Sequence, residues 1–279
     1  MKSSGNTSLH GIIMTCLAKQ IGSHVEITTE KRIKEDLGLS SIKLVFFLTE
    51  TVNHLDLSLA DFSDSELLNL KRVSDIYSLL KRKREKLIEE KLFSPDLLIE
   101  NEDLQLRIVT QNDIPALSQI ASDSSIWKYY LLELSNPTDL ELYVRNLLNE
   151  HLNRRNIPFV IVDKRNENNI VGMSSFGNIS LPDRRIEIGW TWIGKSFQGT
   201  GINSICKNLL INFAFEKLDF IRVEFKTDVL NAQARKALLK IGATEEGILR
   251  SHAQMHGNRR RDTIFYSFLR EEWPKKKME

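Results

Sequence analysis

The chain has 279 residues, of which 41% are hydrophobic and 27% charged, and its net charge is +2. This length accommodates two domains of ordinary size, and the composition is not that of a disordered or fibrous protein. A charge so close to neutral gives no reason to expect nucleic acid or a membrane as a partner, and no apolar run is long enough to span a bilayer. The two cysteines, Cys16 and Cys206, provide no disulfide framework, so we expect a reducing, cytoplasmic location.

The first eighty residues predict a bundle of four helices. Apolar residues recur at helical spacing in three segments, and a shorter helix fits between the second and the last of them. A long loop separates the first two helices. We expect the helices at residues 7–20, 41–55 and 64–70, with the last carrying Val73, Ile76, Tyr77 and Leu80.

Two serines stand where the second helix begins. Gly38 breaks the chain, and Ser40 or Ser41 can cap the helix that follows. A hydroxyl at a helix N-terminus is well placed for a phosphate ester, because the helix dipole and the free N–H groups favour negative charge there. A capped helix without any modification fits the same residues. The apolar positions that follow at helical spacing are Ile42, Val45, Phe46 and Val52.

Residues 35–44 resemble the Asp-Ser-Leu signature of acyl carrier proteins, whose serine bears 4′-phosphopantetheine. The order of the helices is similar as well, so the resemblance covers roughly residues 5–82. It implies that a phosphopantetheinyl transferase modifies Ser41, with Ser40 in the place of the family's aspartate and as the alternative site. Lys43 makes the second helix less acidic than is usual in that family, which indicates a dedicated partner.

A charged segment, residues 81–91, follows the expected bundle. Its basic residues soon mix with glutamates and have no aromatic residues among them, so we interpret it as a solvated helix end and linker rather than a nucleic-acid site. The predicted organisation is a carrier-like domain at residues 1–83, a linker at 84–103 and a second domain at 104–279.

The second part alternates strands and helices, which predicts an α/β domain built on a mixed sheet. Strands are expected at residues 106–109, 159–162, 170–176, 185–192, 222–229, 247–255 and 262–269. Helices are expected at residues 112–122 and 138–154, after Gly201, and from Asn231. In the strand at 185–192 the large apolar residues alternate with Glu187, Gly189 and Thr191, which predicts that these three share the opposite face.

A glycine-rich loop at residues 198–203 lies between a strand and a helix. Gly199 and Gly201 let the backbone approach a diphosphate, toward which the next helix points its N-terminus. Residues 189–196 formally match the P-loop pattern of nucleotide hydrolases as well. We disfavour that interpretation, because β-prone residues fill the pattern and the two glycines interrupt the helix that it requires.

The glycine-rich loop resembles the Gln-x-x-Gly-x-Gly/Ala loop of GCN5-related N-acetyltransferases (GNAT), which holds the pyrophosphate of coenzyme A. The similarity covers about residues 104–273 and is greatest to the branch that includes ribosomal-protein N-terminal acetyltransferases. It implies a GNAT mixed-sheet domain that uses acetyl-CoA or another acyl-CoA. Together with the carrier resemblance, the implied fold class is α plus α/β, with a four-helix acyl-carrier bundle before the GNAT domain. The residues implied in binding the acyl-CoA are Gln198, Gly199, Thr200, Gly201, Ile202, Asn203 and Asn231.

Acyl transfer to an amine needs a group that removes a proton, because an amine is mostly charged at neutral pH. Glu187 is the candidate, since it lies on the polar face of the strand that leads into the loop. A salt bridge to Arg184 or Arg185 is the structural alternative for this side chain. Backbone N–H groups near Trp192 and Ile193 would polarise the thioester carbonyl. No general acid is assigned, because the helix after the next strand lacks the tyrosine or serine that such families often use.

Two features near the C-terminus are less specific. His252 and His256 have a spacing seen in metal sites, but they fall on a strand and a turn without carboxylates or thiols nearby, so no metal is expected. Residues 259–261 are consecutive arginines that could meet an acidic acceptor or a carrier surface, or form a solvated turn.

The two resemblances together suggest three hypotheses. The first is an acyl-CoA-dependent N-acyltransferase of a specialised biosynthetic pathway, whose acceptor amine is held, or whose product is passed on, by the carrier-like domain. The second is that the GNAT domain loads an acyl group from coenzyme A onto the carrier arm. The third is a non-catalytic protein, in which a carrier is joined to a degenerate GNAT fold that only binds a partner.

Overall fold

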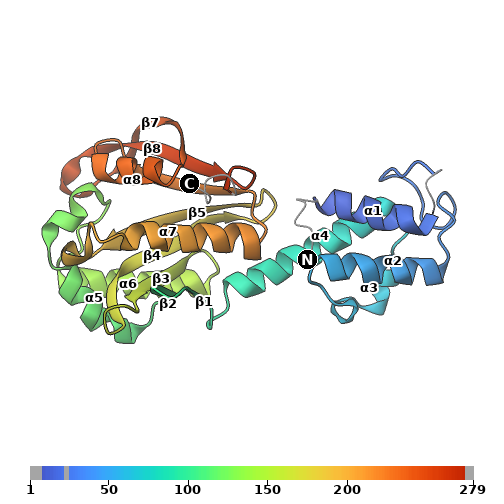
Figure 1. Cartoon of the computed structure of the whole chain (residues 1–279), viewed down its shortest axis with the longest axis horizontal. Coiled ribbons are helices and arrows are strands. Elements are labelled where there is room, and N and C mark those ends of the chain that lie inside the picture. The colour runs from blue at the N-terminus through green and yellow to red at the C-terminus, as the bar shows by residue number, and fades with distance from the viewer. Residues whose placement is uncertain (1–7, 22–24, 274–279) are drawn as a thin grey trace. The chain divides into compact units, whose positions relative to one another are not determined.

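The computed structural model describes residues 8–21 and 25–273. Two compact units make up the chain, Met1–Glu90 and Lys91–Glu279 (Figure 1). The segment predicted as a linker, residues 84–103, contains the last turns of helix α4 (Val73–Leu92) and the strand β1 (Leu98–Glu100). None of the helices in the described ranges has the length and hydropathy that a membrane crossing requires.

The first unit consists of helices in the predicted order. They are α1 (Leu9–Ile21), α2 (Ser41–His54), α3 (Asp64–Leu68) and α4, with a 3-10 turn, η1 (Leu59–Asp61), before α3. Serines precede three of these elements: Ser40, Ser58 and Ser63 each accept a hydrogen bond from a backbone N–H of the turn that follows. Ser58 and Ser63 complete capping boxes with Asp61 and Glu66, which satisfies two otherwise unpaired donors at each start.

Helix α2 has two apolar stripes, and only one of them is buried. Of the apolar positions noted at helical spacing, Ile42, Val45 and Phe46 are 70%, 55% and 63% exposed, whereas Val52 is buried. The helical period fits either stripe, and packing against α1 and the rest of the bundle selects the other one. The buried residues of α2 are Phe47, Leu48, Thr51 and Val52.

The second unit contains one mixed sheet of eight strands in the order β1-β2-β3-β4-β5-β6-β8-β7. Its neighbours pair antiparallel except β5 and β6, which are parallel, and this confirms the mixed-sheet α/β prediction. The strands after β1 are β2 (Leu104–Ile108), β3 (Ile157–Asp163), β4 (Asn169–Ser180), β5 (Arg185–Ile193), β6 (Arg222–Asp228), β7 (Thr244–Gln254) and β8 (Arg260–Leu269).

Helices cover both faces of this sheet. Helices α5 (Ile114–Ala121) and α6 (Pro137–Leu152) pack on one face, against a cluster that includes Val160, Met173 and Trp192. Every residue of β3 is buried, so the other face is covered too, where α7 contacts β1, β2 and β5. The remaining elements are α7 (Ile202–Asn212), α8 (Ala232–Lys240), the π-helical turn η5 (Phe213–Lys217) and the 3-10 turns η2 (Gln111–Asp113), η3 (Ser124–Tyr129), η4 (Lys195–Phe197) and η6 (His256–Asn258).

The two cysteines lie in different units, and both are free and buried. Burial raises the pKa of the Cys16 thiol above its ordinary value. Burial also raises the pKa of the Cys206 thiol, on α7, to about 12.

Adjacent phenylalanines on α2 test which stripe of the helix is buried. Phe47→Ala removes a fully buried ring, so we expect the free energy of unfolding of the first unit to fall by about 3–5 kcal/mol. Phe46→Ala, the matched control, should change it by less than about 0.5 kcal/mol. Urea unfolding followed by far-ultraviolet circular dichroism measures both. Equal losses in the two variants would show that the buried stripe is misassigned.

Candidate active site

The parallel strands β5 and β6 are paired only at their start. The register joins residues 185–187 to residues 222–224 and then stops, although β5 runs to Ile193 and β6 to Asp228. Beyond this point β5 remains paired with β4, and β6 remains paired with β8. The facing edges of β5 and β6 therefore carry backbone groups without a strand partner. Such an edge can form hydrogen bonds to an extended ligand.

A bulge in β5 changes which side chains share a face. Met173 pairs with Trp192 and Gly177 with Glu187, so β5 has one extra residue between these pairs, near Trp190, whose φ is +52°. Because Met173 and Gly177 are four residues apart on β4, Trp192 and Glu187 lie on the same face. The prediction that they lie on opposite faces is wrong, because strict alternation does not allow for the extra residue. The Trp190 ring packs on Gly177, where a Cβ would lie 2.4 Å from it.

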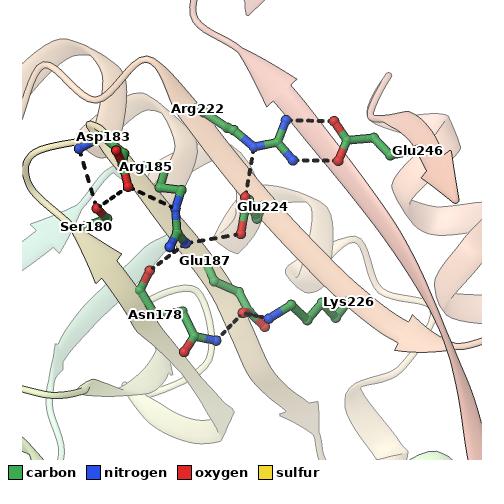
Figure 2. Close-up of polar contacts among 9 residues, drawn as sticks. All are labelled: Asn178, Ser180, Asp183, Arg185, Glu187, Arg222, Glu224, Lys226 and Glu246. Carbon is green, nitrogen blue, oxygen red and sulfur yellow. Dashed lines mark hydrogen bonds and ion pairs between the residues drawn. The ribbon is translucent and has the colours of Figure 1, made fainter. Parts of the chain in front are cut away.

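Glu187 is buried, and two neighbours hold its carboxylate (Figure 2). Its Oε2 lies 2.6 Å from Nζ of Lys226 on β6 and accepts a hydrogen bond of 2.6 Å from Nδ2 of Asn178 on β4. Its Oε1 lies beside Gly189, where a Cβ would be 3.1 Å away. The salt bridge is thus made by a lysine from a strand remote in sequence, and not by one of the adjacent arginines.

A chain of ion pairs crosses the sheet beside Glu187 (Figure 2). Arg185 lies 3.7 Å from Glu224, which accepts a hydrogen bond of 2.8 Å from Nε of Arg222. Arg222 also donates to Glu246 on β7, over 2.6 Å. Glu246 is the largest cause of the raised pKa of Arg222, and Arg222 in turn lowers the pKa of Glu246. These residues join β5, β6 and β7, so we assign them a structural role.

The loop between β5 and α7 has an open backbone. Gly199 and Gly201 have φ values of +80° and +88°, and a Cβ on either would meet no atom within 4 Å. Thr200 Oγ1 donates a hydrogen bond of 2.7 Å to a carbonyl of the preceding turn. Within the described ranges, no acceptor faces the N–H groups of Ile202 and Asn203, at the start of the 11-residue helix α7. Free N–H groups at a helix start can hold a phosphate.

Other predicted side chains around this loop have partners of their own. Gln198 Nε2 donates to the carbonyl of Ile193 over 3.0 Å, which fastens the loop to the end of β5. Asn231 caps α8, and its Oδ1 accepts a hydrogen bond of 3.0 Å from the N–H of Ala234. The Asn203 Oδ1 is buried and has no partner among the described residues.

Several buried polar atoms lie on the face of the sheet that α5 and α6 cover. The Tyr130 hydroxyl, Ser175 Oγ and Trp192 Nε1 find no partner in the described part of the chain. Burial raises the pKa of Tyr130 well above its ordinary value. Buried polar atoms normally form hydrogen bonds, so the face that carries Glu187 has donors and acceptors that a ligand could use. Trp127, three residues before Tyr130, is fully buried in the core.

The three consecutive arginines have different environments. Arg259 pairs with the fully buried Asp228, and Arg260 is exposed. Arg261 is half-buried, and its Nε donates a hydrogen bond of 2.9 Å to Thr263 Oγ1. Arg260 is therefore the exposed one of the three, but it begins β8 rather than forming a turn, and its Nε donates a hydrogen bond of 3.0 Å to Ser251 Oγ on β7.

The two histidines considered as metal ligands are engaged within the protein. His252 Nδ1 lies 3.0 Å from Thr263 Oγ1. His256 Nε2 lies 3.0 Å from the carbonyl oxygen of Trp127, so the turn between β7 and β8 is fastened to η3.

A hollow of about 670 Å³ opens on the second unit beside the glycine-rich loop. It contains none of the predicted site residues. Its lining residues are Ala116, Gln119, Ile120, Ser122, Asp123, Asn169, Ile170, Lys195, Ser196 and Phe197.

In the first unit, the two serines at the start of α2 have different positions. Ser40 is extended, and its Oγ accepts a hydrogen bond of 3.3 Å from the N–H of Lys43, so it is the N-cap. Ser41 is the first residue of the helix and is exposed. The exposed apolar stripe of α2 begins at the next residue, Ile42.

Comparison with known proteins identifies relatives of the second unit. The family model described as an acetyltransferase (GNAT) domain matches residues 103–244, just over half of the chain. The "Putative ribosomal N-acetyltransferase YdaF" of Bacillus subtilis (strain 168) is 28% identical over 176 residues, which are 62% of this chain and 94% of that protein. The structure of Mycobacterium smegmatis RimJ in complex with CoA-disulfide has a TM-score of 0.57 and 24% identity, over 65% of this chain and 91% of that one. At that identity the likeness concerns the fold alone.

A relative of another kind matches a shorter part of the chain. The "Acyl carrier protein homolog" of Mycoplasmopsis pulmonis (strain UAB CTIP) is 34% identical over 71 residues. These residues are 25% of this chain and 89% of that protein.

The ion pair between Glu187 and Lys226 can be tested through stability. Lys226→Met leaves a buried carboxylate without its cation, so we expect a loss of about 1–3 kcal/mol in the free energy of unfolding of the second unit. Adding Glu187→Gln should restore part of that loss, because the uncompensated charge is then removed. Urea unfolding of both single variants and the double variant gives the coupling. Strictly additive losses would contradict an energetic coupling between the two side chains.

Proposed function

The chain belongs to the acetyltransferase (GNAT) family, and from this premise we propose what its two units do. It is an acyltransferase, and the proposed reaction of the second unit is transfer of an acyl group, acetyl in the simplest case, from coenzyme A to an amine. The observation that supports this most is that β5 and β6 stop pairing next to a loop in which Gly199 and Gly201 leave the backbone accessible. The RimJ structure, solved with a derivative of coenzyme A, has the same fold and supports this choice of acyl donor.

Acyl-CoA supplies the acyl group as an activated thioester. The proposed holders of its diphosphate are the N–H groups of the loop and of the helix start, at residues 199–203. Gln198 and Thr200 act by fixing the loop. The side chain of Asn231 caps α8 through its Oδ1, and its Nδ2 is proposed to donate to the co-substrate. The free edge of β5, near Trp192 and Ile193, is proposed to donate N–H hydrogen bonds to the thioester carbonyl.

The reaction moves one proton away from the attacking nitrogen. The amine nitrogen forms a bond to the carbonyl carbon, the carbon–sulfur bond breaks, and the thiolate takes a proton from solvent. Glu187 is the proposed acceptor of the proton that the nitrogen loses, directly or through water. Lys226 and Asn178 hold its Oε2, which orients the carboxylate and leaves Oε1 for the proton.

A conservative substitution separates this role from a structural one. Glu187→Gln should keep the affinity for coenzyme A and lower kcat by about 10²–10⁴-fold, because the amide cannot accept the proton. Coenzyme A release measures turnover, and calorimetry measures binding. Glu224→Gln is the matched control, since Glu224 faces Glu187 across the last backbone pair but is held by Arg222. An unchanged kcat in the Glu187 variant would leave Glu187 a purely structural residue.

For the first unit, the proposed function is that of an acyl carrier with 4′-phosphopantetheine on Ser41. The order of its helices, the exposure of Ser41 at the first position of α2 and the carrier-protein relative support this. Ser40 is the less suitable site, because its hydroxyl is engaged in capping the helix. A carrier on the same chain would raise the effective concentration of an acceptor or product at the acyltransferase, as in a specialised biosynthetic pathway.

Coexpression with a phosphopantetheinyl transferase of broad specificity tests the carrier. Intact-protein mass spectrometry should show one added phosphopantetheine, and Ser41→Ala should abolish it. Ser40→Ala, the matched control, should keep the modification while destabilising the first unit by about 1 kcal/mol through loss of the cap. Modification that depends on Ser40 would move the proposed site by one residue. Absence of modification on both serines would contradict the proposal that the first unit carries phosphopantetheine.

The same modified protein distinguishes N-acyl transfer from loading of the carrier. Incubation with acetyl-CoA and no amine should leave its mass unchanged if the acceptor is an amine. An acyl increment that depends on Ser41 would instead support transfer to the thiol of the carrier arm.

A further inference from the structure

Arg261 lies on the same face of the sheet as Glu187. Its Nε bonds Thr263, two residues further along β8, so the two side chains point the same way. Thr263 is the register partner of Asp228 on β6, and Lys226, which binds Glu187, is two residues before Asp228. Even spacings along paired strands therefore place all five side chains on one face.

The charged groups nearest to Arg261 are paired with other residues. Glu187 is paired with Lys226, and Asp228 with Arg259, so neither carboxylate neutralises the Arg261 guanidinium by an ion pair. The bond from Nε to Thr263 is its one hydrogen bond within residues 25–273, and it has no ion pair there, so the two terminal nitrogens have no acceptor in that range. This face therefore presents a half-buried guanidinium with a charge of +1, whose two terminal nitrogens can donate hydrogen bonds.

The surroundings of Arg261 are those of a ligand site and not of a solvated surface. Burial lowers the pKa of its guanidinium. The negative charges of Asp228 and Glu187 act in the opposite direction but have the smaller effect. The guanidinium lies close enough to Tyr130 to lower the pKa of that hydroxyl, which is buried and has no partner in the described part of the chain. Desolvating a cation without a partner is unfavourable, so this arrangement is expected where a ligand completes it.

We propose that Arg261 binds an anionic group, a carboxylate or a phosphate, carried by the acceptor amine. A guanidinium presents two parallel N–H donors that match either oxyanion. The anion would sit on the face that carries Glu187, which brings the amine of the same molecule to the proposed proton acceptor. This inference rests on the proposed N-acyl transfer, and it restricts the acceptors to amines that bear a negative charge.

Pairs of amines that differ only in the anion test this assignment. With the full-length protein and acetyl-CoA, β-alanine is compared with propylamine, and O-phosphoethanolamine with ethanolamine. The anionic member of at least one pair should have the higher kcat/KM, and the pair that shows it identifies the oxyanion. Arg261→Gln should lower kcat/KM for that member by about 10–100-fold and leave its neutral partner nearly unchanged.

Two further variants control for structure and charge. Arg260→Gln changes an exposed neighbour and should leave the preference intact. Arg261→Lys keeps the positive charge but lacks the two parallel N–H donors. Its kcat/KM for the anionic amine should therefore lie between that of the unchanged protein and that of Arg261→Gln. Equal activity toward both members of each pair, or an equal loss for both in Arg261→Gln, would overturn anion binding while leaving N-acyl transfer in place. Release of coenzyme A with none of the four amines would overturn both the proposed N-acyl transfer and the inference built on it.

Discussion

The site depends on two neighbouring strands of one sheet that stop pairing. Beyond Glu187 and Glu224, β5 and β6 are no longer paired with each other, although both strands continue. Unpaired backbone in the middle of a sheet is tolerated only when something else holds each strand in place. Here β4 and β8 do so, while the bulge at Trp190 bends β5 and re-aims its side chains.

The Glu187–Lys226 pair stands at the point where the strands part. It joins β5 to β6 just beyond their last backbone pair, and Asn178 adds a contact from β4. The same residues therefore limit how far the strands separate and orient the carboxylate proposed to accept a proton. A substitution at Glu187 consequently changes structure and chemistry together, which is why turnover and stability have to be measured separately.

Much of the fold could be predicted from the sequence, because most of its elements are strongly periodic. The alternation of residues 185–192 predicted β5, and the glycine loop was located from Gly199 and Gly201. A strand of three residues, β1, is too short to show a period and was placed in a linker. The apolar stripe of α7 also contains Lys207, whose burial beneath the sheet, with its Nζ 5.6 Å from the Phe225 ring, no local pattern indicates.

The site was less predictable, because its contacts join distant segments. A bulge adds one residue without any marker in the sequence, so the faces assigned to Glu187 and Trp192 were wrong. Lys226 and Asn178, the actual partners of Glu187, are separated from it by 39 and 9 residues, and only the register of three strands brings them together. Three adjacent arginines look alike in sequence, and only burial distinguishes Arg261 from Arg260.

The burial of both cysteines has a consequence for how this protein reacts with thiol reagents. Disulfide exchange and alkylation require a thiolate that the reagent can reach. Cys206 is fully buried with a pKa of about 12, and Cys16 is 1% exposed with a raised pKa, so the folded chain offers almost no reactive sulfur of its own. A chromogenic disulfide added to the unmodified native protein should therefore report free coenzyme A against a low background, to which a phosphopantetheine thiol on Ser41 would add one reactive group.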